Sequence, residues 1–116
     1  MENVERIDTY LESHLEQSIQ ELSMLAAQPS ISAQNLGLVE CANLVGELLK
    51  KRGFTVEIMP TGGAPVVYAE RRGQSDNTLL FYNHYDVQPP EPLELWETPP
   101  FEPSRRDGTR TRPPRS

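Results

Sequence analysis

Cysteine is almost absent from this sequence, since Cys41 is the only one among 116 residues. A lone cysteine cannot form an internal disulfide, and it also excludes any metal cluster built on several cysteines. The absence of a disulfide framework favours a reducing, cytoplasmic compartment. In such a protein we expect Cys41 to be a small buried hydrophobic residue.

Long apolar runs are also missing. The chain contains no stretch of about 18 apolar residues, which excludes a membrane-spanning helix. No basic segment followed by an apolar stretch opens the chain, so we expect no secretory signal. Glycine-rich phosphate loops and the His-Glu-x-x-His pattern are absent as well. The sequence therefore indicates a soluble protein without a membrane partner.

Basic residues are scarce except at the C-terminal end. Residues 1–104 contain 6 basic and 16 acidic side chains, whereas residues 105–116 contain five arginines and one aspartate. An acidic body argues against a nucleic-acid partner, because phosphate binding requires clustered lysine or arginine. The arginine tail alone remains an alternative nucleic-acid site, although no aromatic residue lies between its arginines to stack on bases.

The N-terminal residues show a helical pattern. Apolar side chains recur every three or four positions, which predicts one amphipathic helix that ends near Gln28, before Pro29. His14 lies on the polar side of this helix, where we expect it to be solvated. The apolar positions are Val4, Ile7, Leu11, Leu15, Ile19, Leu22 and Leu25.

The pattern changes along the next part of the chain. A second helix is predicted over residues 38–49, closed by Gly53 in the left-handed cap position. Strands are predicted over residues 54–58, 66–69 and 78–82, the first two as a hairpin. The third is continuously apolar, as in a strand covered on both faces. The order predicts an α/β fold in which two N-terminal helices precede a mixed three-stranded sheet.

Proline is concentrated near the C-terminus. Eight of the 11 prolines lie between residues 89 and 114. Proline lacks an N–H and has a fixed φ, so this stretch cannot form a central strand or a helix interior. We therefore divide the chain into a folded body, residues 1–104, and an Arg/Pro-rich tail, residues 105–116, which we expect to be disordered.

The predicted third strand leads into a pair of residues suited to chemistry, His84 and Asp86. Residues two apart on an extended chain point to the same side, so the two side chains can lie close together. An imidazole binds a divalent metal through one nitrogen while a carboxylate holds the other, and Asp86 could be that carboxylate or a further ligand. A hydrogen-bonded structural histidine is the simpler alternative. Ser30 and Ser32 have no base nearby in the sequence, so a nucleophilic serine is unsupported.

Four segments carry a resemblance to a known family. They are Asn-His-Tyr-Asp-Val-Gln-Pro at 83–89, Trp-Glu-Thr-Pro-Pro-Phe-Glu-Pro at 96–103, Arg-Asp-Gly at 106–108 and the Pro-Ser-Ile-Ser loop at 29–32. Together they resemble the dinuclear zinc exopeptidases and amidohydrolases, which include aminoacylase, carnosinase, glutamate carboxypeptidase and succinyl-diaminopimelate desuccinylase. The Trp-x-x-Pro-Pro-Phe segment looks closest to the carnosinase-like dipeptidase branch.

The resemblance implies roles for the pair. His84 would be a ligand of one of two zinc ions, and Asp86 would be the catalytic-site aspartate that holds its imidazole. The two metals would activate a shared water against the amide bond of a small peptide or N-acyl amino acid, with a glutamate as general base. Residues 96–103 would form a loop beside the cleft or a packed surface loop anchored by Trp96 and Phe101. The fold would be a piece of an α/β/α catalytic domain.

The chain departs from the family after Gly108. The family continues with Leu-Tyr-Gly-Arg-Gly and a metal-bridging aspartate, whereas this chain reads Thr-Arg-Thr-Arg-Pro-Pro-Arg-Ser over residues 109–116. The change suggests a shifted reading frame and a truncated hydrolase that lacks most metal ligands and is inactive alone. The apolar strand at 78–82 would then lack partners. The alternative is a non-catalytic interaction fragment that complements a separately encoded remainder.

Overall fold

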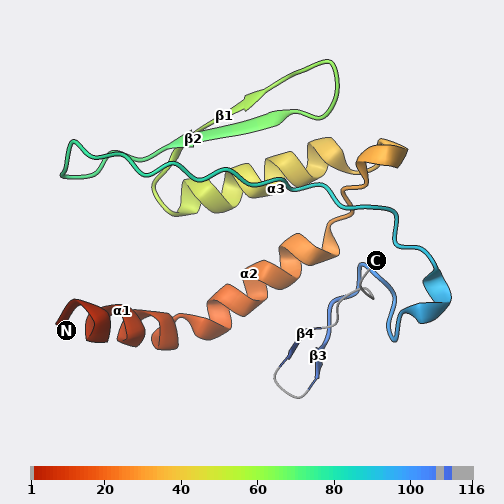
Figure 1. The fold of residues 1–116 in the computed structure, drawn as a ribbon, viewed down its shortest axis with the longest axis horizontal. Helices are drawn as coiled ribbons and strands as arrows, with labels where there is room; N and C mark the ends of the chain where they lie inside the picture. Colours follow the sequence, from red (N-terminus) through yellow and green to blue (C-terminus); the bar gives the residue numbers. More distant parts are fainter. Residues whose placement is uncertain (1, 107–108, 111–116) are drawn as a thin grey trace.

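The computed structural model describes residues 2–106 and 109–110. Its main elements are α1 (Glu2–Ser13), α2 (Leu15–Ala27), α3 (Leu38–Lys51), β1 (Thr55–Met59) and β2 (Val66–Glu70), with the short helices η1 (Ser32–Gln34) and η2 (Leu93–Leu95). Two further strands, β3 (Arg105–Arg106) and β4 (Thr109–Arg110), pair with each other. Figure 1 shows α3 between the β1–β2 hairpin and α2. The predicted α/β class is confirmed.

The predicted first helix is two helices, because the chain breaks at His14. The backbone hydrogen bonds on either side of the break persist, but His14 has φ −108° and ψ 7°. Two side chains compete for the Tyr10 carbonyl: the Ser13 hydroxyl donates to it at 3.0 Å, and His14 Nδ1 lies 2.8 Å from it. Side-chain bonds of this kind bend helices. The expectation that His14 is solvated was wrong, since its half-buried ring stacks on Tyr10 with centroids 3.9 Å apart.

Two glycines in left-handed geometry define the ends of α3. Gly53, at φ +86°, confirms the predicted cap: its N–H donates to the Lys50 carbonyl and that of Phe54 donates to Leu49. Gly37, at φ +73°, precedes the helix, and a Cβ built there would lie 2.0 Å from the Pro29 carbonyl oxygen. Only glycine therefore fits at the entry to α3.

The hairpin and α3 form the best-packed part of the chain. β1 and β2 pair antiparallel, with Val56 opposite Ala69 and Ile58 opposite Val67, which confirms the predicted hairpin. Gly46 of α3 lets the helix approach the hairpin, because a Cβ there would lie 3.3 Å from the side chains of Val56 and Ile58. The buried hydrophobic residues are Ile31, Leu38, Cys41 and Ala42. The expected burial of Cys41 is confirmed, and that burial raises the pKa of its thiol.

The predicted third strand is not formed. Residues 78–82 form no strand, and Leu79, Leu80, Phe81 and Tyr82 are 79–92% exposed. A strand requires an adjacent edge to hydrogen-bond with, and within the described residues β2 pairs with β1 alone. The expectation that this strand is the most buried, in a mixed three-stranded sheet, is corrected accordingly.

The rest of the chain is loosely arranged. The Cα radius of gyration is 16.7 Å, whereas a compact domain of this length has about 13 Å. The described part of the proline-rich stretch at 89–114 contains no α-helix, and its only strands are the two-residue β3 and β4, which pair with each other alone. Four residues of the tail expected to be disordered, 105–106 and 109–110, instead form the β3–β4 pair. Residues 107–108 and 111–116 lie outside the described residues, so for them the predicted disorder stays a prediction. Across the described ranges, no helix has both the length and the apolar character needed to cross a bilayer.

Candidate functional site

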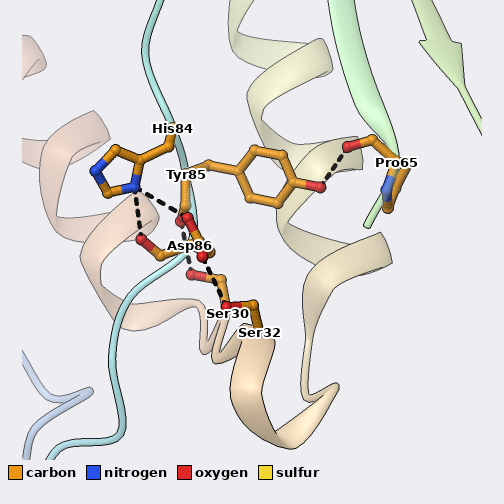
Figure 2. Close-up of polar contacts among 6 residues, drawn as sticks. All are labelled: Ser30, Ser32, Pro65, His84, Tyr85 and Asp86. Carbon is orange, nitrogen blue, oxygen red and sulfur yellow. Dashed lines mark hydrogen bonds and ion pairs between the residues drawn. The ribbon is translucent and has the colours of Figure 1, made fainter. Parts of the chain in front are cut away.

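His84 and Asp86 lie together, as their spacing predicts. His84 Nδ1 is 3.0 Å from Asp86 Oδ1 and 3.0 Å from the Asp86 backbone oxygen (Figure 2). Both oxygens can only accept hydrogen bonds, so in the neutral imidazole this geometry favours the proton on Nδ1 and leaves the Nε2 lone pair free. The His84 side chain is 81% exposed. The free nitrogen is thus open to a metal ion or another electrophile.

The Asp86 carboxylate is fixed from its other side by Ser32. The Ser32 hydroxyl donates to Asp86 Oδ2 at 2.7 Å. This hydrogen bond, and then the one from His84, lowers the pKa of Asp86 below its ordinary value, since both favour the charged form. The carboxylate is therefore ionised at neutral pH, with one oxygen bound to each neighbour.

The segment that carries the pair is anchored to the loop after α2. The buried Ser30 hydroxyl donates to the Tyr85 carbonyl at 2.8 Å, and the Val87 N–H donates to the Ser30 carbonyl at 2.8 Å. The Tyr85 hydroxyl donates to the Pro65 carbonyl at 2.6 Å, and burial raises the pKa of this phenol (Figure 2). His84 and Tyr85 point to opposite sides of the segment in Figure 2, so tyrosine fixes the backbone while histidine faces solvent.

The donor set around this pair is small. Among residues 2–106 and 109–110, no group of three or more histidine, cysteine, aspartate or glutamate side chains could hold a metal ion. A zinc site needs three or four protein ligands, so His84 would supply one of them. The roles predicted for His84 and Asp86 remain predictions. Trp96 and Phe101 of the 96–103 loop are half-buried.

Sequence reasoning missed the contribution of Ser30 and Ser32. It found a nucleophilic role for them unsupported and assigned them no contact with the site, whereas their hydroxyls bind the segment 84–87 from 55 and 54 residues away in the sequence. No periodicity connects positions so distant. The Pro-Ser-Ile-Ser motif was the available signal, because it resembled the same family as the His84 segment.

No family model matches the chain. Over 84 residues, 72% of this chain, it is 38% identical to a succinyl-diaminopimelate desuccinylase of Azoarcus sp. (strain BH72) and 37% identical to that of Bordetella avium (strain 197N). A crystal structure of an M20 family metallo-carboxypeptidase from Sulfolobus solfataricus matches 77% of the chain with a TM-score of 0.73 and 40% identity. The chain spans 21% of the length of each of these proteins.

Proposed function

This chain belongs to the M20 metallopeptidase family, of which it carries one segment, and we propose that it supplies part of a zinc-dependent amide-hydrolysing centre. The substrate class would be a dipeptide or an N-acyl amino acid. The observation that supports this most directly is the His84 imidazole, with Nδ1 held by Asp86 and Nε2 free in an 81% exposed side chain. A ligand imidazole in a zinc enzyme has this arrangement, in which a carboxylate fixes the ring and its tautomer.

The described residues fit one ligand of such a centre and not the whole of it. His84 offers a neutral nitrogen and Asp86 its orienting carboxylate, while the described ranges bring no third donor to them. A pair of zinc ions, when bound, would lower the pKa of a shared water and polarise the amide carbonyl. In this proposal the chain contributes the His84 imidazole, held in one orientation by Asp86. We therefore expect no hydrolysis by the 116-residue chain alone.

A chimera tests the proposal. The 84 matched residues of this chain would replace the corresponding segment of the Azoarcus desuccinylase, and zinc content and cleavage of succinyl-diaminopimelate would be measured. We expect a zinc-loaded, active chimera that loses zinc and at least about 100-fold in activity on His84→Ala, because a ligand and its metal-bound water are lost together. The matched control is His14→Ala, at the chain's other histidine. Full activity and zinc content in the His84→Ala chimera would refute the assignment.

The exposed apolar segment favours a second candidate function. Leu79, Leu80, Phe81 and Tyr82 together present a continuous apolar strip that is 79–92% exposed, and such strips mark surfaces that another polypeptide covers. In this second proposal the chain is a non-catalytic fragment that complements a separately encoded remainder, whose strands would pair with residues 78–82.

Co-purification distinguishes the two candidates. The remaining part of the Azoarcus enzyme, lacking the matched segment, would be produced separately and mixed with the 116-residue chain. Stable association that Leu80→Lys abolishes, and that Val39→Lys at another exposed apolar position leaves intact, would support complementation. Absence of association would contradict complementation, and the metal-centre proposal would then be tested by the chimera alone.

We further propose a cytoplasmic location. The free Cys41 thiol is buried and the described residues contain no other cysteine. Unpaired buried cysteines are typical of reducing compartments. Fractionation of cells that express the tagged chain would test this, and recovery in a secreted fraction would contradict it.

A further inference from the structure

We propose that Ser32 is a positioning residue of the His84 site, acting through Asp86 to fix the tautomer of the imidazole. The inference deepens the proposed function, because only one tautomer leaves Nε2 available to a metal. It also predicts a property of the metal-free chain that can be measured without zinc or substrate.

The geometry forms a three-membered chain of hydrogen bonds. The Ser32 hydroxyl donates to Asp86 Oδ2 at 2.7 Å, and Asp86 Oδ1 lies 3.0 Å from His84 Nδ1 (Figure 2). The carboxylate is therefore bound at both oxygens, each by a different partner. A carboxylate held at one oxygen can rotate about its side-chain torsion, which is broad, whereas one held at both keeps a single orientation.

The exposed location of Ser32 allows its effect on the site to be separated from an effect on the packing of the chain. The Ser32 side chain is exposed, at the start of η1, and it contacts the site from the loop after α2. Ser30, two residues earlier, is 3% exposed and bonds the Tyr85 backbone. Ser30 therefore holds the segment in place, and Ser32 acts on the ionised side chain alone. Removal of the Ser32 hydroxyl should alter the imidazole without unfolding the chain.

Loss of the Ser32 hydroxyl frees Asp86 Oδ2, and the carboxylate then spends less time bound to Nδ1–H, which keeps the uncharged Asp86 backbone oxygen, 3.0 Å away, as its other acceptor. With the charged acceptor weakened, part of the ring proton population shifts toward Nε2, which is the tautomer that leaves no lone pair for a metal at the exposed nitrogen. A threonine at this position carries the same hydroxyl on the same carbon. Ser32→Thr should therefore keep the proton on Nδ1.

Ring nitrogen NMR of the metal-free 116-residue chain tests this. At a pH where the imidazole is neutral, we expect the wild-type His84 ring to show a protonated Nδ1 and an unprotonated Nε2. In Ser32→Ala the two nitrogen shifts should converge, and in Ser32→Thr they should return to the wild-type positions. Ser18→Ala, on the exposed face of α2, is the matched control. The urea midpoint of each variant shows that the fold is retained.

Two results would overturn the assignment. One is a wild-type ring protonated at Nε2, and the other is unchanged His84 nitrogen shifts in Ser32→Ala. Neither result depends on zinc or hydrolysis, so failure of this inference is distinguishable from failure of the metal-centre proposal.

Discussion

Two regions of this chain differ in how their structure is maintained. The packed layer, residues 29–70, contains a capped helix that packs on a paired hairpin, and it holds the four hydrophobic residues that are buried within the described ranges. The open segment, residues 71–104, carries the candidate chemistry, has η2 as its longest regular element and exposes its most apolar run. It is attached to the layer through the Ser30 and Ser32 contacts and through the bond from the Tyr85 hydroxyl to the Pro65 carbonyl.

The difference shows that the site depends on the layer more than on its own segment. His84 and Asp86 follow residues 78–82, which form no strand, yet their orientation is specified by bonds to the loop after α2. A segment with few apolar contacts contributes little to stability, so its geometry follows from the element that it is bonded to. Substitutions in the two regions should therefore lower the free energy of unfolding by very different amounts.

The largest expected difference is between Ile31→Ala and Leu80→Ala. Ile31 is 2% exposed and Leu80 is 89% exposed. Truncating a buried isoleucine removes apolar contacts and leaves a cavity, so we expect a loss of about 3 kcal/mol in the free energy of unfolding. Truncating Leu80 should change it by less than about 0.5 kcal/mol. Urea denaturation followed by circular dichroism measures both, and equal costs would show that the open segment is packed in solution.

Sequence predicted the packed layer well, for a physical reason. The periodicities of α3 and of the β1–β2 hairpin, and the glycine cap at Gly53, are local properties that a few neighbouring residues encode. The proximity of His84 and Asp86 was predicted for the same reason, since two residues on an extended chain need no distant partner.

The errors of prediction involve interactions that a local pattern does not contain. The break at His14 arises from side chains that compete for the Tyr10 carbonyl, although the apolar spacing is continuous through it. Residues 78–82 have the composition of a covered strand, but pairing depends on an edge supplied from elsewhere. The Ser32–Asp86 bond joins positions 54 apart in the sequence.

The next largest difference in stability is expected between alanine substitutions at two glycines. Gly37, in the packed layer, has φ +73° and would place a Cβ 2.0 Å from a backbone oxygen, whereas Gly73, in the open segment, has nothing within 4 Å. We expect Gly37→Ala to cost about 2 kcal/mol through strain at the entry to α3. Gly73→Ala should be neutral within about 0.5 kcal/mol. The same urea experiment applies, and a neutral Gly37→Ala would mean that the loop before α3 adapts freely.

A smaller effect is expected where the two regions join. Ser30→Ala removes a buried donor from the Tyr85 carbonyl, and we expect a loss of about 1 kcal/mol in unfolding free energy. Ser32→Ala removes a bond between exposed groups, so its cost should be within about 0.5 kcal/mol. Hydrogen exchange of the Val87 amide, which donates to the Ser30 carbonyl, provides a local measurement. Its exchange should accelerate in Ser30→Ala and stay near wild type in Ser32→Ala.

The smallest expected effect is the pH dependence of the contact between α2 and the packed layer. Glu21 accepts from Arg52 and, at 3.3 Å, from Lys51, and these bonds, led by that of Arg52, lower its pKa below the ordinary 4.5 despite opposing desolvation. A lowered folded-state pKa gives a contribution that is present above the ordinary value and lost as the pH falls through the folded value. Wild-type stability should therefore decline below pH 4.5, whereas Glu21→Gln should be less stable at neutral pH and decline less steeply.

The control is Glu16→Gln, which breaks the exposed ion pair with Arg105 at the other end of the chain. Its stability should follow the wild-type curve as the pH falls, since exposed ion pairs contribute little to stability. Parallel acid curves for wild type and Glu21→Gln would show that α2 is not held to the packed layer by this carboxylate.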